Sequence, residues 1–436
     1  MPSLLVRDAI ILTQDARRTA LRGDLLAREG MIEAIGPGLR ADADVTVEAG
    51  GDILLPGFVN AHTHSPMTLF RGLGDDLPLE EWLRTRIWPA ERRLTQDDII
   101  TGTQLALLEM IRTGTTCFND MYFFSDATAQ AAAAAGIRAH VGATLIGFDT
   151  PELKVHEQEP NARRHHAKWK DHALITPTLS PHATYTMSDD ALERCRAVRD
   201  ETGMRIHTHC SETRFEVQDV LSKKGARPVE VLRRHDLLRG SVLAHCGWVT
   251  KDEIRVMAEH GASAAHCPIS NLKLATGGVM PMEEMREAGV TVALGTDGAA
   301  SNNSLDMLET TKFAAILQKN HRWDARAAPA QVVLDQATIG GSRALGLDAR
   351  GLVVGAPADL CLVSTKAPHM RPLHDPASAL VYCAHGGDVR MTAVAGKPLY
   401  LDGRFLTLDE QAVVAKTDRA AERLGRAVAN GLGPVR

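Results

Sequence analysis

Residues 55–64 read Leu-Pro-Gly-Phe-Val-Asn-Ala-His-Thr-His, an apolar stretch that ends in two histidines. The apolar run predicts a buried strand, Ile53–Ala61, and side chains two apart on a strand lie on the same face. His62 and His64 would therefore share one face at the carboxyl end of the strand and could hold one metal ion together. In a chain with 18 histidines a single His-x-His motif is weak evidence, so the surrounding pattern must decide.

Short apolar runs alternate with helical patterns after this stretch. Seven further strands are predicted: Thr115–Asn119, Arg138–Leu145, Ala173–Ser180, Arg205–Cys210, Ser241–Cys246, Ala262–Cys267 and Thr291–Gly295. The predicted helices are Asp97–Arg112, Asp189–Glu201, Lys251–His260, Pro281–Ala288, Leu305–Lys319 and Ala330–Leu345. Eight strands with intervening helices over roughly 300 residues favour an α/β fold of the closed (β/α)8 TIM type over an open sheet.

The two ends of the chain do not show this alternation of strand and helix patterns. Leu4–Leu12 and Met31–Ile35 are short strand-like runs separated by turns, and Leu360–Val363 begins a second β-rich region. An alanine-rich, charged helix closes the chain. We predict that residues 1–56 and 355–436 combine into one small β-sandwich-like accessory domain. Residues 57–354 would form the catalytic barrel.

Composition excludes several classes of protein. The formal net charge of -5 provides no basic surface, so neither nucleic acid nor an anionic membrane is an expected partner. The amino terminus lacks a signal-peptide pattern, and no apolar run approaches the roughly 20 residues that span a bilayer. The seven cysteines are scattered without a Cys-x-x-Cys pair, which argues against a disulfide scaffold and a thiolate metal site. A reducing cytoplasm fits best, and a homo-oligomer is left open.

Residues that bind metals recur at the carboxyl ends of the predicted strands, where barrel enzymes keep their active groups. Strands four to eight end, in order, at His182, His209, His245, His266 and Asp297. Neutral imidazoles with one carboxylate are typical of a catalytic Zn²⁺ site with an open position. Such a metal lowers the pKa of bound water to about 7, so hydrolysis or hydrolytic deamination is the expected chemistry.

Other residues near these positions have simpler explanations. His207, His260 and His266 are expected to be structural or to support the ligands. His207 shares a strand face with His209, so spacing alone does not say which of the two binds metal. The neighbouring cysteines, at positions 210, 246 and 267, are expected to pack outside the barrel as small apolar side chains.

Five segments together resemble the amidohydrolase superfamily and, more narrowly, the 5'-methylthioadenosine/S-adenosylhomocysteine deaminases. They are residues 55–64, 209–213, 244–246, 266–274 and 295–303, and the similarity runs through the whole chain. His-x-His is common to the superfamily, whereas the segments at strands seven and eight are far more specific. The resemblance implies that one Zn²⁺ per chain is bound by His62, His64, His209 and Asp297.

The resemblance also implies catalytic and substrate-binding roles. Glu212 matches the glutamate that shuttles a proton to ring N1 of the purine, while Asp297 and His245 hold the attacking water. Glu91 matches a contact to the ribose hydroxyls and His182 a contact to the nucleoside. Taken without the family, Glu91 would be read as a solvated helix residue. The implied reaction is hydrolytic deamination of an adenosine-type nucleoside with release of ammonia.

Two absences in the sequence bear on the metal count and on the substrate. Binuclear relatives bridge two metals with a lysine on strand four, and His172–Thr184 contains no lysine, so one metal is expected. Relatives that accept S-adenosylhomocysteine have an arginine after strand three, whereas the loop Phe148–Pro160 contains none. Arg163 and Arg164 could replace it only if they reach the site. We therefore expect 5'-methylthioadenosine or adenosine to be preferred.

Two other functions remain open. An aminohydrolase acting on a free base or heterocycle such as guanine, cytosine or a triazine would give Glu91 no ribose to bind. A metal-binding scaffold without catalysis is disfavoured because Glu212 and His245 accompany every ligand. Zinc deaminases of polynucleotides need a Pro-Cys-x-x-Cys element, and this sequence has none.

Overall fold

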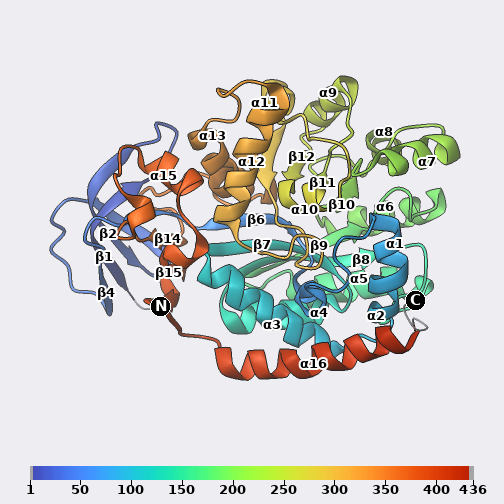
Figure 1. Ribbon diagram of the computed structural model, residues 1–436, viewed down its shortest axis with the longest axis horizontal. Coiled ribbons are helices and arrows are strands. Elements are labelled where there is room, and N and C mark those ends of the chain that lie inside the picture. Colours follow the sequence, from blue (N-terminus) through green and yellow to red (C-terminus); the bar gives the residue numbers. More distant parts are fainter. Residues whose placement is uncertain (1–2, 432–436) are drawn as a thin grey trace.

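The computed structural model describes residues 3–431 and shows a parallel α/β barrel with a β-rich region at one side (Figure 1). The barrel strands are β6 (Phe58–Thr63), β7 (Thr115–Tyr122), β8 (Arg138–Leu145), β9 (Ile175–Pro181), β10 (His207–Cys210), β11 (Val242–His245), β12 (Ser263–His266) and β13 (Thr291–Leu294). They form two four-stranded halves, β6 to β9 and β10 to β13. A backbone bridge from Leu179 to Ile206 joins the halves on one side, and the amide of Asp297 donates to the carbonyl of His62, 3.0 Å away, on the other. The predicted (β/α)8 fold is confirmed.

The first predicted strand, Ile53–Ala61, is wrong as a single element. β5 (Ile53–Pro56) pairs with β1 and β14 in the accessory sheet, whereas β6 begins the barrel. Gly57 separates them, and a Cβ atom there would lie only 2.1 Å from the side chain of Thr116. Because glycine has no side chain, the chain can leave the accessory sheet and enter the barrel at this point. An apolar run alone does not reveal such a change of sheet.

Helices cover the outside of the barrel. The longer ones are α3 (Gln96–Arg112), α4 (Ser125–Ala135), α5 (Val155–Trp169), α6 (Asp189–Thr202), α7 (Arg214–Lys224), α9 (Lys251–Glu259) and α12 (Met307–Arg322). The shorter ones are α8 (Pro228–Arg234), α10 (Pro268–Lys273), α11 (Met282–Glu287) and α15 (Pro376–Tyr382). The predicted helix Ala330–Leu345 is divided into α13 (Ala330–Asp335), a π-helical turn η3 (Gln336–Gly340) and α14 (Gly341–Leu345).

Both ends of the chain contribute to one accessory sheet of nine strands. Its order is β17-β16-β15-β14-β5-β1-β2-β3, with β4 paired to β1. The bounds are β1 (Leu4–Leu12), β2 (Ala20–Arg28), β3 (Met31–Gly36), β4 (Val45–Glu48), β14 (Leu360–Val363), β15 (Val389–Val394), β16 (Lys397–Leu401) and β17 (Arg404–Phe405). Buried residues from both ends, including Leu4, Leu54 and Leu360, share a core of their own. We retain the division at residues 56/57 and 354/355 as a proposal.

The segment between β6 and α3 folds into short helices that the sequence analysis did not predict. They are η1 (Ser65–Phe70), α1 (Leu79–Trp82), the π-helical turn η2 (Leu83–Ile87) and α2 (Trp88–Glu91). We call residues 79–91 the lid segment, because its side chains line the cavity at the carboxyl end of the barrel. The last helix, α16 (Glu410–Gly431), runs from the accessory sheet past α3 to the neighbourhood of α2 (Figure 1).

All seven cysteines are free, and Cys210 and Cys246 belong to the apolar core together with residues of α6 and α8. Within residues 3–431, none of the helices combines the length and the apolar character needed to traverse a bilayer.

Candidate active site and metal centre

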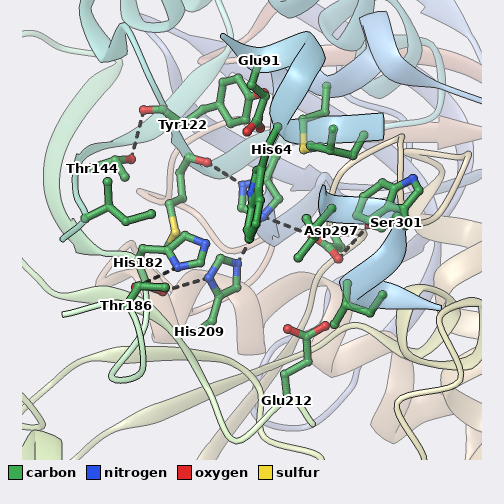
Figure 2. A pocket seen from close by; sticks show the side chains of 18 of the residues that line it. His64, Glu91, Tyr122, Thr144, His182, Thr186, His209, Glu212, Asp297 and Ser301 are labelled. Atoms are coloured by element: carbon green, nitrogen blue, oxygen red, sulfur yellow. Dashed lines mark hydrogen bonds and ion pairs between the residues drawn. The ribbon is translucent and has the colours of Figure 1, made fainter. Parts of the chain in front are cut away.

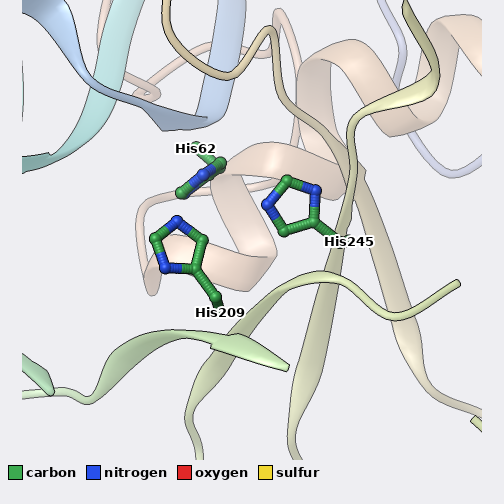
Figure 3. A group of neighbouring side chains, drawn as sticks. All are labelled: His62, His209 and His245. Carbon is green, nitrogen blue, oxygen red and sulfur yellow. The ribbon is translucent and has the colours of Figure 1, made fainter. Parts of the chain in front are cut away.

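Four side chains from opposite sides of the barrel meet at its carboxyl end. The Nε2 atom of His64 lies 3.2 Å from Nε2 of His209 and 3.2 Å from Oδ1 of Asp297. Nε2 of His62 lies 3.4 Å from the same carboxylate oxygen. The structure thus brings together all four residues that the sequence analysis assigned to the metal. His245 is close as well, and the rings of His62, His209 and His245 converge (Figure 3).

The other ring nitrogen of each histidine is engaged, so every Nε2 atom faces the centre. Nδ1 of His64 donates to the carbonyl of Met121 at 2.5 Å, and Nδ1 of His209 donates to the carbonyl of His182 at 2.8 Å. A carbonyl accepts but cannot donate, so these Nδ1 atoms carry the proton and neutral Nε2 atoms present lone pairs. Two lone pairs 3.2 Å apart repel one another unless a cation or a proton lies between them.

His207 lies beneath the site and contacts a proposed ligand. Its Nε2 atom lies 2.8 Å from Nδ1 of His62, whose own Nε2 is buried and has no hydrogen-bond partner within residues 3–431. Spacing left open whether His207 or His209 faces the centre, and the geometry places His209 there. His207 instead supports the ring of His62, as the partners of ligating histidines commonly do.

The electrostatics of the site suit a divalent cation. Burial opposes the charge of Asp297, but the neighbouring imidazoles of His62 and His64 outweigh it and hold the pKa of the carboxyl well below its ordinary value. Burial lowers the pKa of His62 to about 4, whereas Asp297 overcomes burial at His64 and raises that pKa to about 9. Without a metal, the centre therefore combines the anion of Asp297 with one protonated imidazole, that of His64. A metal ion that displaces the proton of His64 would supply the positive charge in its place, so the residues fit the metal.

Backbone features hold Asp297 against the first strand. Gly295 lies opposite His62, and a Cβ atom at that position would approach the backbone and Cβ of His62 to about 2.9 Å. Asp297 itself adopts a left-handed backbone with φ of 62°, and His245 does so with φ of 71°. Such conformations cost free energy in residues other than glycine and cluster at functional sites.

Two serines that the sequence analysis did not single out hold the carboxylate. Ser270 Oγ and Ser301 Oγ donate to Oδ2 of Asp297 at 2.6 and 2.8 Å, which leaves Oδ1 facing the histidines. Ser270 lies in α10, after β12, and Ser301 lies in the loop after β13, both within segments that carried the family resemblance. That position was the available signal, but a serine after a strand is too common to identify alone.

Glu212 and His245 lie side by side below the centre. Oε2 of Glu212 is 3.9 Å from Nε2 of His245, and burial raises the pKa of the Glu212 carboxyl. Glu216, another residue missed from the sequence, accepts the backbone amides of Ser211 and Glu212 at 3.0 and 2.7 Å and fixes this turn. On the far side, Nδ2 of Asn271 lies 3.1 Å from Nδ1 of His245. The pair is thus oriented from both sides.

Glu91 lies across the cavity from Glu212, with His64 between them (Figure 2). Its carboxylate accepts a hydrogen bond from the hydroxyl of Tyr122 at 2.7 Å, and burial raises its pKa despite that bond. The residue is therefore not a solvated helix residue: α2 presents it to the cavity. Tyr122, at the end of β7, was missed because nothing in the sequence connects it with Glu91.

His182 completes the group of predicted site residues. It follows β9 and its Nδ1 atom lies 3.1 Å from Oγ1 of Thr186, while burial lowers its pKa to about 3. A neutral imidazole with one free nitrogen can donate to or accept from a neutral ligand.

Together with the lid segment, these residues line a cavity of about 200 Å³. One end carries the polar groups described above, namely His64, His182, His209, Glu212, His245 and Asp297. The remaining wall is largely apolar and aromatic: Leu79, Trp82, Leu83, Trp88, Phe123, Ile146, Phe148 and Tyr185. Neither arginine nor lysine lines this cavity among residues 3–431. The site suits a largely neutral, partly aromatic molecule.

Comparisons with known proteins identify the family of the chain. Residues 53–399 match the model of the amidohydrolase family. The 5-methylthioadenosine/S-adenosylhomocysteine deaminase of Nitratidesulfovibrio vulgaris is 42% identical over 95% of this chain and 96% of its own. The 5'-deoxyadenosine deaminase of Methanosarcina mazei is 42% identical over 97% of this chain and 99% of its own.

A solved structure extends the similarity to three dimensions. The crystal structure of an adenosine deaminase from Xanthomonas campestris with bound zinc superposes with a TM-score of 0.93 at 39% identity, covering 97% of this chain and 98% of the other. Fold and sequence thus agree over nearly the whole chain. It belongs to the amidohydrolase family, in the branch that contains the methylthioadenosine/S-adenosylhomocysteine deaminases.

Proposed function

We propose that this chain is a zinc-dependent aminohydrolase that converts an adenosine-type nucleoside to its inosine analogue and ammonia. We further propose that it prefers a small neutral 5' group, as in 5'-methylthioadenosine or adenosine. The observation that carries the proposal is the placement of Glu212 and Glu91 on opposite sides of the four-residue centre (Figure 2). One carboxylate is within reach of a purine ring at the centre and the other can receive a ribose.

His62, His64, His209 and Asp297 would hold one Zn²⁺, since all offer unshared electron pairs toward one point. β9 contains no lysine that could bridge a second ion. When bound, the metal supplies Lewis-acid activation of a water molecule near neutral pH.

The protein residues supply the remaining chemistry. The raised pKa of Glu212 suits a group that takes a proton from the water and delivers it to ring N1 of the purine. His245, 3.9 Å from Glu212, and Asp297 would orient the water toward C6 through hydrogen bonds. Protonation of N1 makes C6 more electrophilic, so the oxygen of the water bonds to C6. The remaining proton of the water, taken up by Asp297 or His245, would pass to the exocyclic amine, and the C6–N bond breaks to release ammonia.

A ribose is supported over a free base by the arrangement at Glu91. Its carboxylate is fixed by Tyr122 and still has lone pairs directed into the cavity, which suits two neighbouring hydroxyl groups. A free guanine, cytosine or triazine would leave the remaining lone pairs of this buried carboxylate without a hydrogen-bond donor, which costs free energy. His182 is placed to contact the nucleoside from the β9 side.

The preference at the 5' position follows from what the cavity lacks. Arg163 lies on α5 and pairs with Glu201 at 2.7 Å, and Arg164 pairs with Asn161 at 3.1 Å, so both side chains are engaged away from the cavity. A carboxylate on the 5' substituent would find no cationic partner within the cavity lining. Burial of that charge without a partner would weaken binding.

A substrate panel tests the proposed reaction. Purified, zinc-loaded protein would be incubated separately with adenosine, 5'-methylthioadenosine, adenine, guanine, cytosine and an amino-triazine, and ammonia release followed. We expect release from the two nucleosides and little from the free bases. Faster release from any free base would contradict the nucleoside assignment, and no release from the whole panel would support the inactive scaffold.

A further inference from the structure

The terminal helix α16 has no role in the proposed chemistry, yet it packs against the part of the protein that carries Glu91. It lies antiparallel to α3, with an ion pair at each end. Near the start of α16, Glu410 pairs with Arg112 at 3.1 Å, at the end of α3. Farther along, Arg423 pairs with Asp98 in the first turn of α3. Figure 1 shows α16 extending past α3 toward α2.

The apolar face of α16 packs beneath the lid segment. Leu424 is only 1% exposed and belongs to one buried cluster with Trp82, Ile87, Ala90 and Leu94. Trp82 and Ile87 also line the cavity. The same short helices therefore contact the cavity on one side and α16 on the other.

Polar contacts connect α16 to the turn that follows Glu91. Asp98, which receives Arg423 on one carboxylate oxygen, accepts the amide and hydroxyl of Thr95 on the other, at 2.8 and 2.7 Å. Arg423 also donates to the carbonyl of Arg93 at 3.5 Å. Residues 92–95 between α2 and α3 are thus held from outside the barrel by one arginine and its partner.

The lid segment contains little regular structure that could stabilise its own conformation. Its helices α1 and α2 have four residues each, and the turn between them is π-helical. Helices this short are not stable alone and depend on packing. The packing is provided by α16 on one side and by the cluster around η1 on the other.

We propose that α16 is a brace that holds the lid segment in place, with Leu424 and Arg423 as positioning residues for Glu91. The residues act through the lid and do not touch the substrate. This inference rests on the proposed role of Glu91 toward the ribose. It predicts that the accessory end of the chain determines how well the enzyme recognises the sugar, although it contributes no group to the chemistry.

The test compares Leu424→Ala and Arg423→Gln with two controls on the same helix. Val414→Ala shortens an apolar side chain that is 42% exposed, and Arg426→Gln breaks an exposed pair with Glu422. Leu424→Met serves as the conservative variant, because it keeps an apolar side chain of similar volume. Zinc content and unfolding temperature would be recorded for each protein, so that a general loss of folding is recognised.

Two measurements are expected to move in Leu424→Ala and Arg423→Gln. Amide hydrogen exchange should accelerate in peptides covering residues 79–95 while the barrel strands stay protected. KM for adenosine should rise on the order of tenfold with kcat changed much less, because the centre itself is untouched. Preference for adenosine over 2'-deoxyadenosine should fall, and Leu424→Met, Val414→Ala and Arg426→Gln should resemble wild type.

A double-variant cycle separates this inference from the proposed function. In a Glu91→Ala background, Leu424→Ala should cause little further loss of sugar discrimination. Unchanged exchange at residues 79–95 in Arg423→Gln and in folded Leu424→Ala would overturn the brace. Accelerated exchange together with a wild-type enzyme that never discriminates the 2'-hydroxyl would support the brace but refute the ribose role of Glu91.

Discussion

Among single residues, Glu212 is positioned for its proposed role by two neighbours. Glu216 fixes its backbone, and His245 faces its carboxylate. Glu212→Gln keeps the shape and the hydrogen-bonding capacity of the side chain but removes the ability to carry a proton. We expect turnover to fall by about 10²-fold or more while zinc content stays near normal. Steady-state kinetics on adenosine and elemental analysis check this, and turnover near that of wild type would assign the acid/base role to another residue.

The metal ligands should behave as a unit. Because His62, His64, His209 and Asp297 face one point, His62→Asn or Asp297→Asn should lose zinc and activity together. Wild-type protein should hold about one zinc ion per chain after dialysis. Two tightly held ions would contradict the single site.

A second group of possible metal ligands, at the surface, needs a control when the zinc ions per chain are counted. His369, His385 and Asp388 form an exposed group whose atoms could also hold an ion. Elemental analysis should therefore include His385→Ala, which leaves the barrel intact. A second ion that disappears in this variant would belong to the surface and not to the active site.

Glu91 tests the choice between a nucleoside and a free base. If it accepts hydrogen bonds from both ribose hydroxyls, Glu91→Ala should weaken binding of adenosine by about 2–3 kcal/mol. The variant should also discriminate less between adenosine and 2'-deoxyadenosine, and KM and kcat measured for both nucleosides check this. Unchanged kinetics would leave the carboxylate with only its contact to Tyr122.

Single residues differ in how far the sequence could identify them. His62, His64, His209 and Asp297 were predictable as a group, since ligand types recurred at strand ends that a barrel brings together. Tyr122, Ser270 and Glu216 were not, because each acts through a partner distant or inconspicuous in sequence. Each contributes through the position and orientation of its hydrogen-bonding group relative to that partner, which only the fold determines.

At the scale of elements, the approach of β13 to β6 determines the site. Gly295 lets β13 lie close to His62, so Gly295→Ala should push the strands apart and displace Asp297. Overpacking of this kind costs about 1–3 kcal/mol of folding free energy. We expect a lower unfolding temperature and weaker zinc retention than in Gly36→Ala, whose added Cβ atom meets nothing within 4 Å. Equal zinc affinity in the two variants would show that the strand spacing does not set the ligand geometry.

Elements with a clear hydrophobic period were predicted well and those without one were not. β8 (Arg138–Leu145) has the predicted bounds, and α3 and α6 begin or end within one residue of the prediction. The split of Ile53–Ala61 at Gly57 was missed because both halves are apolar and a change of sheet leaves no periodic signal. The lid segment was missed because helices of four residues depend on packing, here against α16 and η1, more than on their own sequence.

At the scale of the whole molecule, the two chain ends meet to build the accessory sheet. β14 returns to pair with β5 immediately before the first barrel strand, and Arg138 of β8 forms an ion pair with Asp359 at 2.6 Å. Barrel and accessory sheet are thereby joined at the point where the chain passes from one to the other. From this sheet α16 returns along the barrel to the lid segment, so Leu424 lies in one buried cluster with Trp82 and Ile87 of the cavity wall.

The charge distribution around the cavity determines which 5' substituents can be bound. The lining contains Glu91, Glu212 and Asp297 but, within residues 3–431, neither arginine nor lysine, and Phe148 and Tyr185 make its outer wall apolar. We expect kcat/KM to be higher for 5'-methylthioadenosine and adenosine than for S-adenosylhomocysteine, because the carboxylate of the last would lose its hydration without gaining a cationic partner.

The measurement is kcat/KM for the three nucleosides under one set of conditions, repeated at high salt to expose any electrostatic contribution. If S-adenosylhomocysteine equals or exceeds the other two, a cation must reach the substituent from outside the lining. Arg163 and Arg164 are engaged on α5, whereas Arg92 borders an adjoining cavity together with Glu91, Phe148 and Asp149. Arg92→Gln would then be the decisive variant: a selective loss of S-adenosylhomocysteine turnover would show that the adjoining cavity receives the amino-acid end of the substrate.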